Sequence, residues 1–146
     1  MATLKLDLFA RSFREHAGTI WPLAKRWPGA LRHSPNVMRL SEIPSDVLLY
    51  VKDKSDAPGF WGLNKPQLEE IRRSGFRWFV VLLVGEAEQC YLLPSEFIDD
   101  AIADNRWSRS VDDYKLHEGP ELEGAQTFDS FVELFRHLPR APVRAA

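Results

Sequence analysis

An uninterrupted run of seven apolar residues, from Trp78 to Val84, constrains the fold of this chain more than any other feature. A strand with one wet face alternates apolar and polar residues, whereas a continuous β-branched and aromatic run is typical of a strand buried on both faces. A second continuous run predicts a neighbouring buried strand over residues 46–52. We therefore expect a sheet that helices cover on its faces.

Helix and strand signals fill the chain around these two runs. The segment from Leu63 to Gly75 predicts a helix, because Asn64 can cap it, Gln67 follows three residues later and Gly75 can terminate it. Further helices are predicted over 3–17, from Pro94 onward and over 129–138, and further strands over 37–40, 89–93 and 112–117, while the proline-rich segment 19–36 is expected to be an irregular connector.

This order of elements predicts an α/β (α+β) fold. We expect a single domain over residues 1–139, with a mixed central sheet of about four or five strands and helices packed on its faces. Residues 140–146 are expected to form a disordered tail. A length of 146 residues, with 45% hydrophobic and 27% charged residues, is ordinary for one globular domain.

Composition excludes several classes of protein. No segment approaches the roughly 18 apolar residues that a membrane span needs, and the N-terminus has no long apolar region, so we expect neither a membrane protein nor a secreted one. Cys90 is the single cysteine, which rules out an intramolecular disulfide and favours a cytoplasmic location. The four histidines are widely separated, and we expect no metal site from them.

Two familiar catalytic and nucleotide-binding patterns are missing from the sequence. It contains no phosphate-binding glycine loop and no nucleophile elbow, and Cys90 in a predicted strand is expected to be inert.

The segment from Gly59 to Gly62 encloses Phe60 and Trp61 between glycines. We favour a hydrophobic plug that seats the following helix, with a base-stacking platform as the alternative.

The order of elements also resembles the restriction-endonuclease-like core. That fold places an Asp on one strand and a carboxylate-x-Lys pair on the next, where the carboxylates hold Mg²⁺ and the lysine polarises water or phosphate. Asp46 can be the first carboxylate, but the run at 78–84 offers no such pair. Of the six lysines, only Lys115 has an acidic residue two positions earlier, namely Asp113. The resemblance implies a divergent metal-dependent nuclease that uses Mg²⁺; without that activity we expect no cofactor.

Charge is distributed unevenly along the chain. Residues 1–40 hold seven Lys and Arg against two acidic residues, and residues 81–146 hold six against thirteen. Basic side chains interleaved with Trp21 and Trp27 can neutralise phosphates and stack on bases. The alternative is that the basic and acidic halves neutralise each other in the fold. The residues that we expect to bind nucleic acid are Arg14, Lys25, Arg26, Arg32, His33 and Arg39.

Three functions therefore remain, and the sequence does not decide whether the chain is an enzyme. The favoured one is a small non-catalytic domain that binds a partner, preferably nucleic acid, through its basic and aromatic N-terminal surface. The first alternative is the divergent nuclease built around Asp46, Asp113 and Lys115. The second is a protein-interaction or oligomerisation module with a protein partner or a second copy of the chain.

Overall fold

The computed structural model describes residues 8–9, 11–12, 23–26, 37–41, 46–53, 60–73, 75, 77–84 and 88–138. Within these ranges, residues 23–26, 37–41 and 46 are described by their backbone. Everything below refers to this part of the chain.

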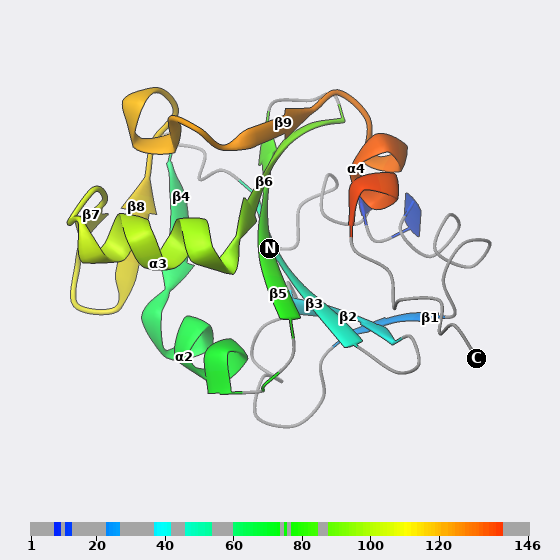
Figure 1. Ribbon diagram of the computed structural model, residues 1–146, viewed down its shortest axis with the longest axis horizontal. Coiled ribbons are helices and arrows are strands. Elements are labelled where there is room, and N and C mark those ends of the chain that lie inside the picture. The colour runs from blue at the N-terminus through cyan, green and yellow to red at the C-terminus, as the bar shows by residue number, and fades with distance from the viewer. Residues whose placement is uncertain are drawn as a thin grey trace, which may run out of the picture.

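A six-stranded sheet forms the centre of the molecule (Figure 1). Its strand order is β1-β2-β3-β5-β6-β9, and β3 and β5 run parallel while the other neighbours run antiparallel. Parallel neighbours need a crossover connection, and here the segment that holds β4 and α2 supplies it. The strands are β1 Leu23–Arg26, β2 Val37–Ser41, β3 Asp46–Lys52, β5 Arg77–Val84, β6 Gln89–Pro94 and β9 Gln126–Phe128.

The two faces of this sheet bury two separate hydrophobic cores. Because side chains alternate along a strand, β3 and β5 each supply both cores. One core holds Leu49, Val81 and the buried residues of helix α4 (Phe131–His137). Phe9 belongs to the same core, and its ring packs edge-on against that of Phe131 with 4.9 Å between the ring centres. The other holds Leu48, Val80 and residues of α2 and α3. Continuous apolar runs in β3 and β5 are explained by burial on both faces.

A second, smaller sheet covers one edge of the second core. It has the strand order β4-β8-β7 and lies beside α3 in Figure 1. Strand β4 (Trp61–Asn64) pairs antiparallel with β8 (Asp113–Leu116), and β8 pairs with β7 (Ser108–Arg109). Trp61 is fully buried, and its indole N–H donates to the carbonyl oxygen of Leu83 at 3.0 Å. This bond joins the small sheet to β5 of the central sheet.

Local sequence signals explain where the helices begin. Helix α2 (Lys65–Arg73) starts after Asn64, whose side-chain oxygen accepts the backbone N–H of Gln67 at 3.0 Å. Helix α3 (Ser95–Ala103) follows Pro94, and α4 is capped by Ser130, which accepts the N–H of Glu133 at 3.1 Å. No helix among the described residues is long and apolar enough to cross a bilayer.

The predicted fold class is confirmed: the chain is a mixed α+β protein with helices on a mixed sheet. The sheet has six strands rather than four or five. Strand β1 lies in the segment that was expected to be an irregular connector. A strand is possible there because Pro22 and Pro28 fall outside the paired residues 23–26 and remove no hydrogen bond from the ladder. Strands β4, β7 and β9 were not expected. Of the predicted 3–17 helix, the described residues 8–9 and 11–12 are helical, and the predicted 140–146 tail lies outside the described residues.

Candidate functional site

The six residues expected to bind nucleic acid are only partly described. Arg14, Arg32 and His33 lie outside the described residues. Lys25 and Arg26 belong to β1 and Arg39 belongs to β2, at one edge of the central sheet. The backbone register pairs Lys25 directly with Arg39. The structure thus brings two of the predicted basic positions together, and the role of all six stays a prediction.

The three residues of the nuclease alternative come from two strands. Asp46 opens β3, whereas Asp113 and Lys115 lie two residues apart on β8 and therefore on the same face of the small sheet. Asp113 pairs in register with Asn64, and Lys115 pairs with Gly62. The carboxylate of Asp113 acts electrostatically on Tyr50 and Lys52, in the second half of β3. Asp113 therefore interacts with the second half of β3, whereas Asp46 is the first residue of that strand.

Four side chains meet where the small sheet adjoins the end of β3, and we call them the Lys52 site: Tyr50, Lys52, Asn64 and Asp113. Asn64 holds the group together. Its backbone N–H donates to the Tyr50 hydroxyl at 3.3 Å, and its side-chain nitrogen lies 3.5 Å from Oδ1 of Asp113. The ammonium of Lys52 lies 5.7 Å from the centre of the Tyr50 ring.

Burial sets the electrostatics of the Lys52 site. It lowers the pKa of the half-buried Lys52 ammonium below its ordinary value, and the negative charge of Asp113 offsets only part of that shift. It also raises the pKa of Tyr50 to about 12, with the N–H of Asn64 acting in the opposite direction and Asp113 adding to the rise. The site therefore combines a phenol that is neutral at physiological pH and the carboxylate of Asp113 with an ammonium whose charged form burial disfavours.

The Lys52 site does not fit a magnesium ion held by two carboxylates. Asp113 is its one carboxylate, the Asn64 side-chain oxygen already accepts the N–H of Gln67, and the Tyr50 hydroxyl accepts the N–H of Asn64. Among the described residues, no group of three or more His, Cys, Asp and Glu lies together. Mg²⁺ binding usually draws on one or two carboxylates together with waters and substrate phosphates. Asp113 can supply one such carboxylate, but the described residues form no preformed site for the ion.

Sequence reasoning overlooked Tyr50, Lys52 and Asn64 as members of a site. The signal was Tyr50-Val51-Lys52, which has the spacing of a carboxylate-x-Lys pair on a central strand but carries tyrosine in place of the acid. A pattern that requires an acidic residue does not include it. Asn64 was correctly predicted as a helix cap, but its second role, linking Tyr50 to Asp113, depends on the β4–β8 pairing.

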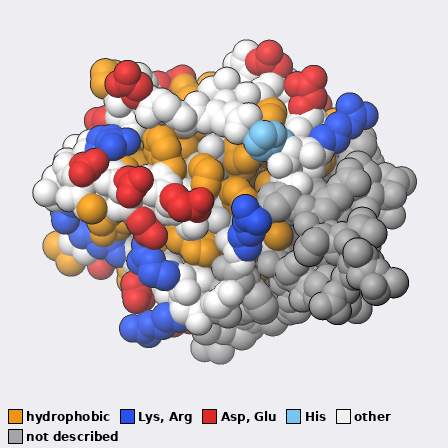
Figure 2. Space-filling model, in the orientation of Figure 1, with side chains coloured by type: hydrophobic (Ala, Val, Ile, Leu, Met, Phe, Trp, Pro, Cys, Tyr) orange, Lys and Arg blue, Asp and Glu red, His pale blue; other side chains and the backbone are white. Residues whose placement is uncertain are grey.

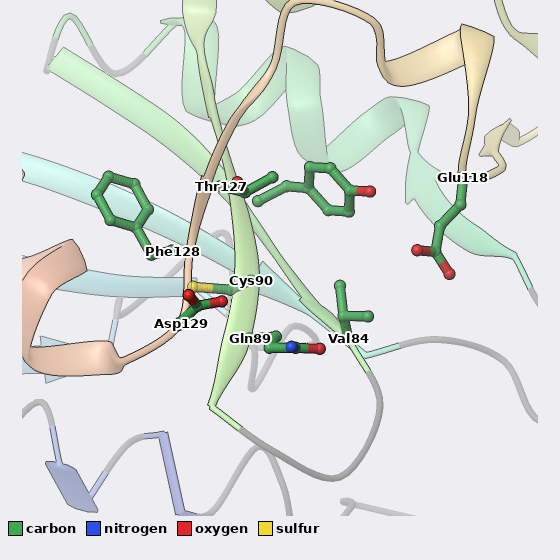
Figure 3. Close-up of a pocket in the computed structure, with 8 residues that line it drawn as sticks. Val84, Gln89, Cys90, Glu118, Thr127, Phe128 and Asp129 are labelled. Atoms are coloured by element: carbon green, nitrogen blue, oxygen red, sulfur yellow. The ribbon is translucent and has the colours of Figure 1, made fainter.

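A separate pocket of about 220 Å³ opens at the β6–β9 edge (Figure 3). Its lining includes Cys90, whose thiol is buried, and the two carboxylates of Glu118 and Asp129. Burial raises the pKa of Cys90 to about 12, and the charges of Glu88 and Asp129 add to the rise. The thiol is therefore neutral at physiological pH, as expected for an inert cysteine, and the pocket offers no nucleophile from it.

The surface of α2 and α3 mixes charges of both signs. Acidic and basic side chains interleave over these helices in the view of Figure 2. Arg72 of α2 joins Asp99 of α3 at 2.6 Å and Glu69 within its own helix at 3.3 Å. Charges of α2 and α3 thus neutralise each other locally. Neutralisation of the basic residues 1–40 by the acidic residues 81–146 stays a prediction.

The arrangement of the central sheet and its helices has a counterpart among solved structures. Among solved structures, the chain is similar to Hjc, a Holliday junction resolvase from the archaeal hyperthermophile Archaeoglobus fulgidus, with a TM-score of 0.50 and 12% sequence identity. The match covers 86% of this chain and 98% of the resolvase chain. No model of a protein family and no curated protein sequence matches the chain. At this identity the likeness shows the fold alone.

Proposed function

We propose that the protein binds nucleic acid and that the Lys52 site contacts the phosphodiester backbone. The observation that carries this proposal is the position of the half-buried Lys52 ammonium, 5.7 Å from the centre of the Tyr50 ring in a group of side chains whose one carboxylate is Asp113. Asp113 is too weak a partner to restore the pKa of Lys52, so a half-buried ammonium remains that a second anion would stabilise. A phosphate oxygen supplies that anion, and a charge-assisted hydrogen bond from Lys52 would hold it.

Two further features favour nucleic acid over a small anion. Lys115 lies on the same face of the small sheet as Asp113, which extends positive charge beyond Lys52. A solved structure with a similar fold is that of a Holliday junction resolvase. The basic positions of β1 and β2, among them Lys25 and Arg39, would add contacts that are independent of sequence.

Binding to labelled DNA tests the proposal. Fluorescence anisotropy with single-stranded, duplex and four-way-junction oligonucleotides, each at several salt concentrations, gives the affinity and its dependence on salt. We expect Lys52→Gln to weaken binding about tenfold and to reduce the slope of log K against log salt by about one, because one phosphate contact is lost.

Arg73→Gln is the matched control for that experiment. Arg73 is well exposed and pairs with Glu69 on α2, so its substitution makes the same change in net charge away from the Lys52 site. We expect affinity within about twofold of the wild type, since distant exposed charges are screened. If both substitutions weaken binding equally, binding depends only on the overall charge of the protein, and a specific contact of Lys52 is contradicted. Absence of salt-dependent binding to all three DNAs would contradict the function itself.

Cleavage of the bound backbone is the second candidate, and the Tyr50-x-Lys52 spacing on a central strand of a nuclease fold favours it. In such a reaction, Lys52 would bind a non-bridging phosphate oxygen and Asp113 would orient the attacking water. The described residues hold no preformed pair of metal-binding carboxylates, so this candidate depends on donors that the DNA or the rest of the chain supplies.

Cleavage is checked by incubating the same DNAs with Mg²⁺ or Mn²⁺ and resolving the products on denaturing gels. If the protein is a nuclease, Lys52→Gln and Asp113→Asn should each lower the rate at least about a hundredfold, as loss of one electrostatic contact to a transition state does. Binding without products from the wild type would leave nucleic-acid binding as the function.

A further inference from the structure

The two aromatic residues of the Phe60-Trp61 pair have opposite environments. Trp61 is the expected hydrophobic plug: it is fully buried and bonded to Leu83. Phe60 precedes β4 and is half-buried. Because neighbouring residues of an extended chain point to opposite faces, the burial of Trp61 directs Phe60 away from the core. One residue of the pair therefore remains available to a ligand.

The surroundings of Phe60 suit a nucleotide. The ammonium of Lys115 lies 5.3 Å from the centre of the Phe60 ring, and the ring of His117 lies 5.8 Å away at 48°. His117 is held in place by Glu121, whose carboxylate accepts its backbone N–H at 3.1 Å and lies 3.3 Å from its Nδ1. An aromatic ring with a cation over it combines a surface on which a base can stack with a contact for the phosphate of that nucleotide.

This aromatic group adjoins the Lys52 site through Gly62. A Cβ atom placed on Gly62 would lie 3.8 Å from the Phe60 ring and 3.9 Å from Oδ2 of Asp113. Phe60 and Asp113 thus both border the same position, which has no side chain. A strand whose phosphate reaches Lys52 would therefore pass its neighbouring base close to Phe60.

We propose that Phe60, Lys115 and His117 form a stacking subsite for one unpaired base of a DNA strand that is bound at the Lys52 site. This inference rests on the proposed nucleic-acid binding. Stacking needs an exposed face of the base, so it predicts a preference for single-stranded or branched DNA over continuous duplex. Lys115 would contact the phosphate of the stacked nucleotide, and the ring of Phe60 would contact its base.

The test compares two oligonucleotides with the same phosphates. One is an oligothymidylate of about ten nucleotides, and the other has abasic residues throughout. We expect the wild type to bind the oligothymidylate about tenfold more tightly, and Phe60→Ala to bind both with the affinity of the abasic strand. Phe60→Tyr retains a ring and should keep the discrimination. Thermal melts of each variant show whether the fold is intact.

Phe128→Ala is the matched control. Phe128 is also half-buried and also lies against a histidine, with 5.3 Å between its ring centre and that of His137 at 53°, but it belongs to β9. Its substitution should leave the base-dependent part of binding unchanged. If the wild type binds both strands equally, or if Phe60→Ala still discriminates between them, the stacking subsite is wrong while the proposed function stands. If the wild type binds neither strand, the proposed function fails first.

Discussion

Lys52 and Tyr50 show how one strand accommodates two polar side chains under burial. They lie on the same face of β3, two residues apart. Tyr50 is almost completely buried and has its hydroxyl bonded to the backbone of Asn64, so its neutral form is stable there. The charged form of Lys52 is less stable in this position. It loses solvation on burial, and the negative charge of Asp113 offsets only part of that loss. A lysine whose charged form is disfavoured by burial is a candidate functional residue.

Removing the charge of Lys52 should stabilise the free protein while weakening DNA binding. A lysine with a lowered pKa binds fewer protons in the folded state than in the unfolded state, so stability rises with pH up to the ordinary pKa of 10.5. Lys52→Met should raise the melting temperature at pH 7 by about 2 °C and flatten its rise toward pH 10. Differential scanning calorimetry from pH 7 to 10 measures both effects. Arg73→Met is the control and should produce no gain; a lower melting temperature for Lys52→Met would contradict the argument.

The thiol of Cys90 should be unreactive in the native protein. Its pKa of about 12 leaves very little thiolate at pH 8, and the side chain is 1% exposed. We expect a chromogenic disulfide reagent to react on the order of a hundredfold or more slowly than with the unfolded chain. The rate should rise with denaturant in parallel with unfolding. Rapid labelling in native buffer would show that the β6–β9 edge opens locally.

Among the elements, α2 was the most predictable and the small sheet the least. The start of α2 follows from Asn64, because a cap acts over three residues and leaves a local signal. Strands β7 and β9 have two and three residues, too few for a periodic pattern. The pairing of β4 with β8 joins segments about fifty residues apart, and no local pattern encodes it. Asp113 and Lys115 were therefore found by spacing alone, and Lys52 was missed.

The Asn64 cap gives a prediction at this scale, since α2 and the Lys52 site share it. Asn64→Ala should lower the free energy of unfolding by about 1 kcal/mol through loss of the cap. It also removes the side-chain contact with Asp113. Asn64→Ser keeps a capping oxygen but is too short for that contact, so it should retain stability yet weaken DNA binding. Urea denaturation and anisotropy separate the two roles; equal behaviour of both variants would contradict a dual function.

In the whole molecule, the candidate site lies where the central sheet and the small sheet meet, and we call this region the joint. The central sheet supplies Tyr50 and Lys52, and the small sheet with its helix supplies Asn64 and Asp113. Trp61 fixes this joint through its bond to Leu83, at the point where β3 has ended and no longer pairs with β5. The continuous apolar runs sufficed to predict the central sheet, but the position of the joint depends on contacts that only the folded chain creates.

Loss of the Trp61 bond should loosen the joint. Trp61→Phe leaves the Leu83 carbonyl without this donor, and we expect the free energy of unfolding to fall by about 1–3 kcal/mol. Hydrogen exchange should show lower protection of β4 and β8 than of β5. Trp107→Phe is the control, because the Trp107 indole also bonds a carbonyl, that of Glu121 at 2.9 Å, but within the small-sheet side of the molecule. Equal loss of protection throughout would show that the two sheets open as one unit.

The distance along the chain between Lys52 and Asp113 has a consequence for synthesis. A nascent chain that has completed β5 already carries Lys52 on a central strand, but β8 follows roughly thirty residues later. Until then the buried ammonium has neither its carboxylate nor Asn64 held in register by β8. The molecule therefore acquires its site only after β8 has been translated, and a product truncated before β8 would keep most of the central sheet while lacking the means to recognise a ligand.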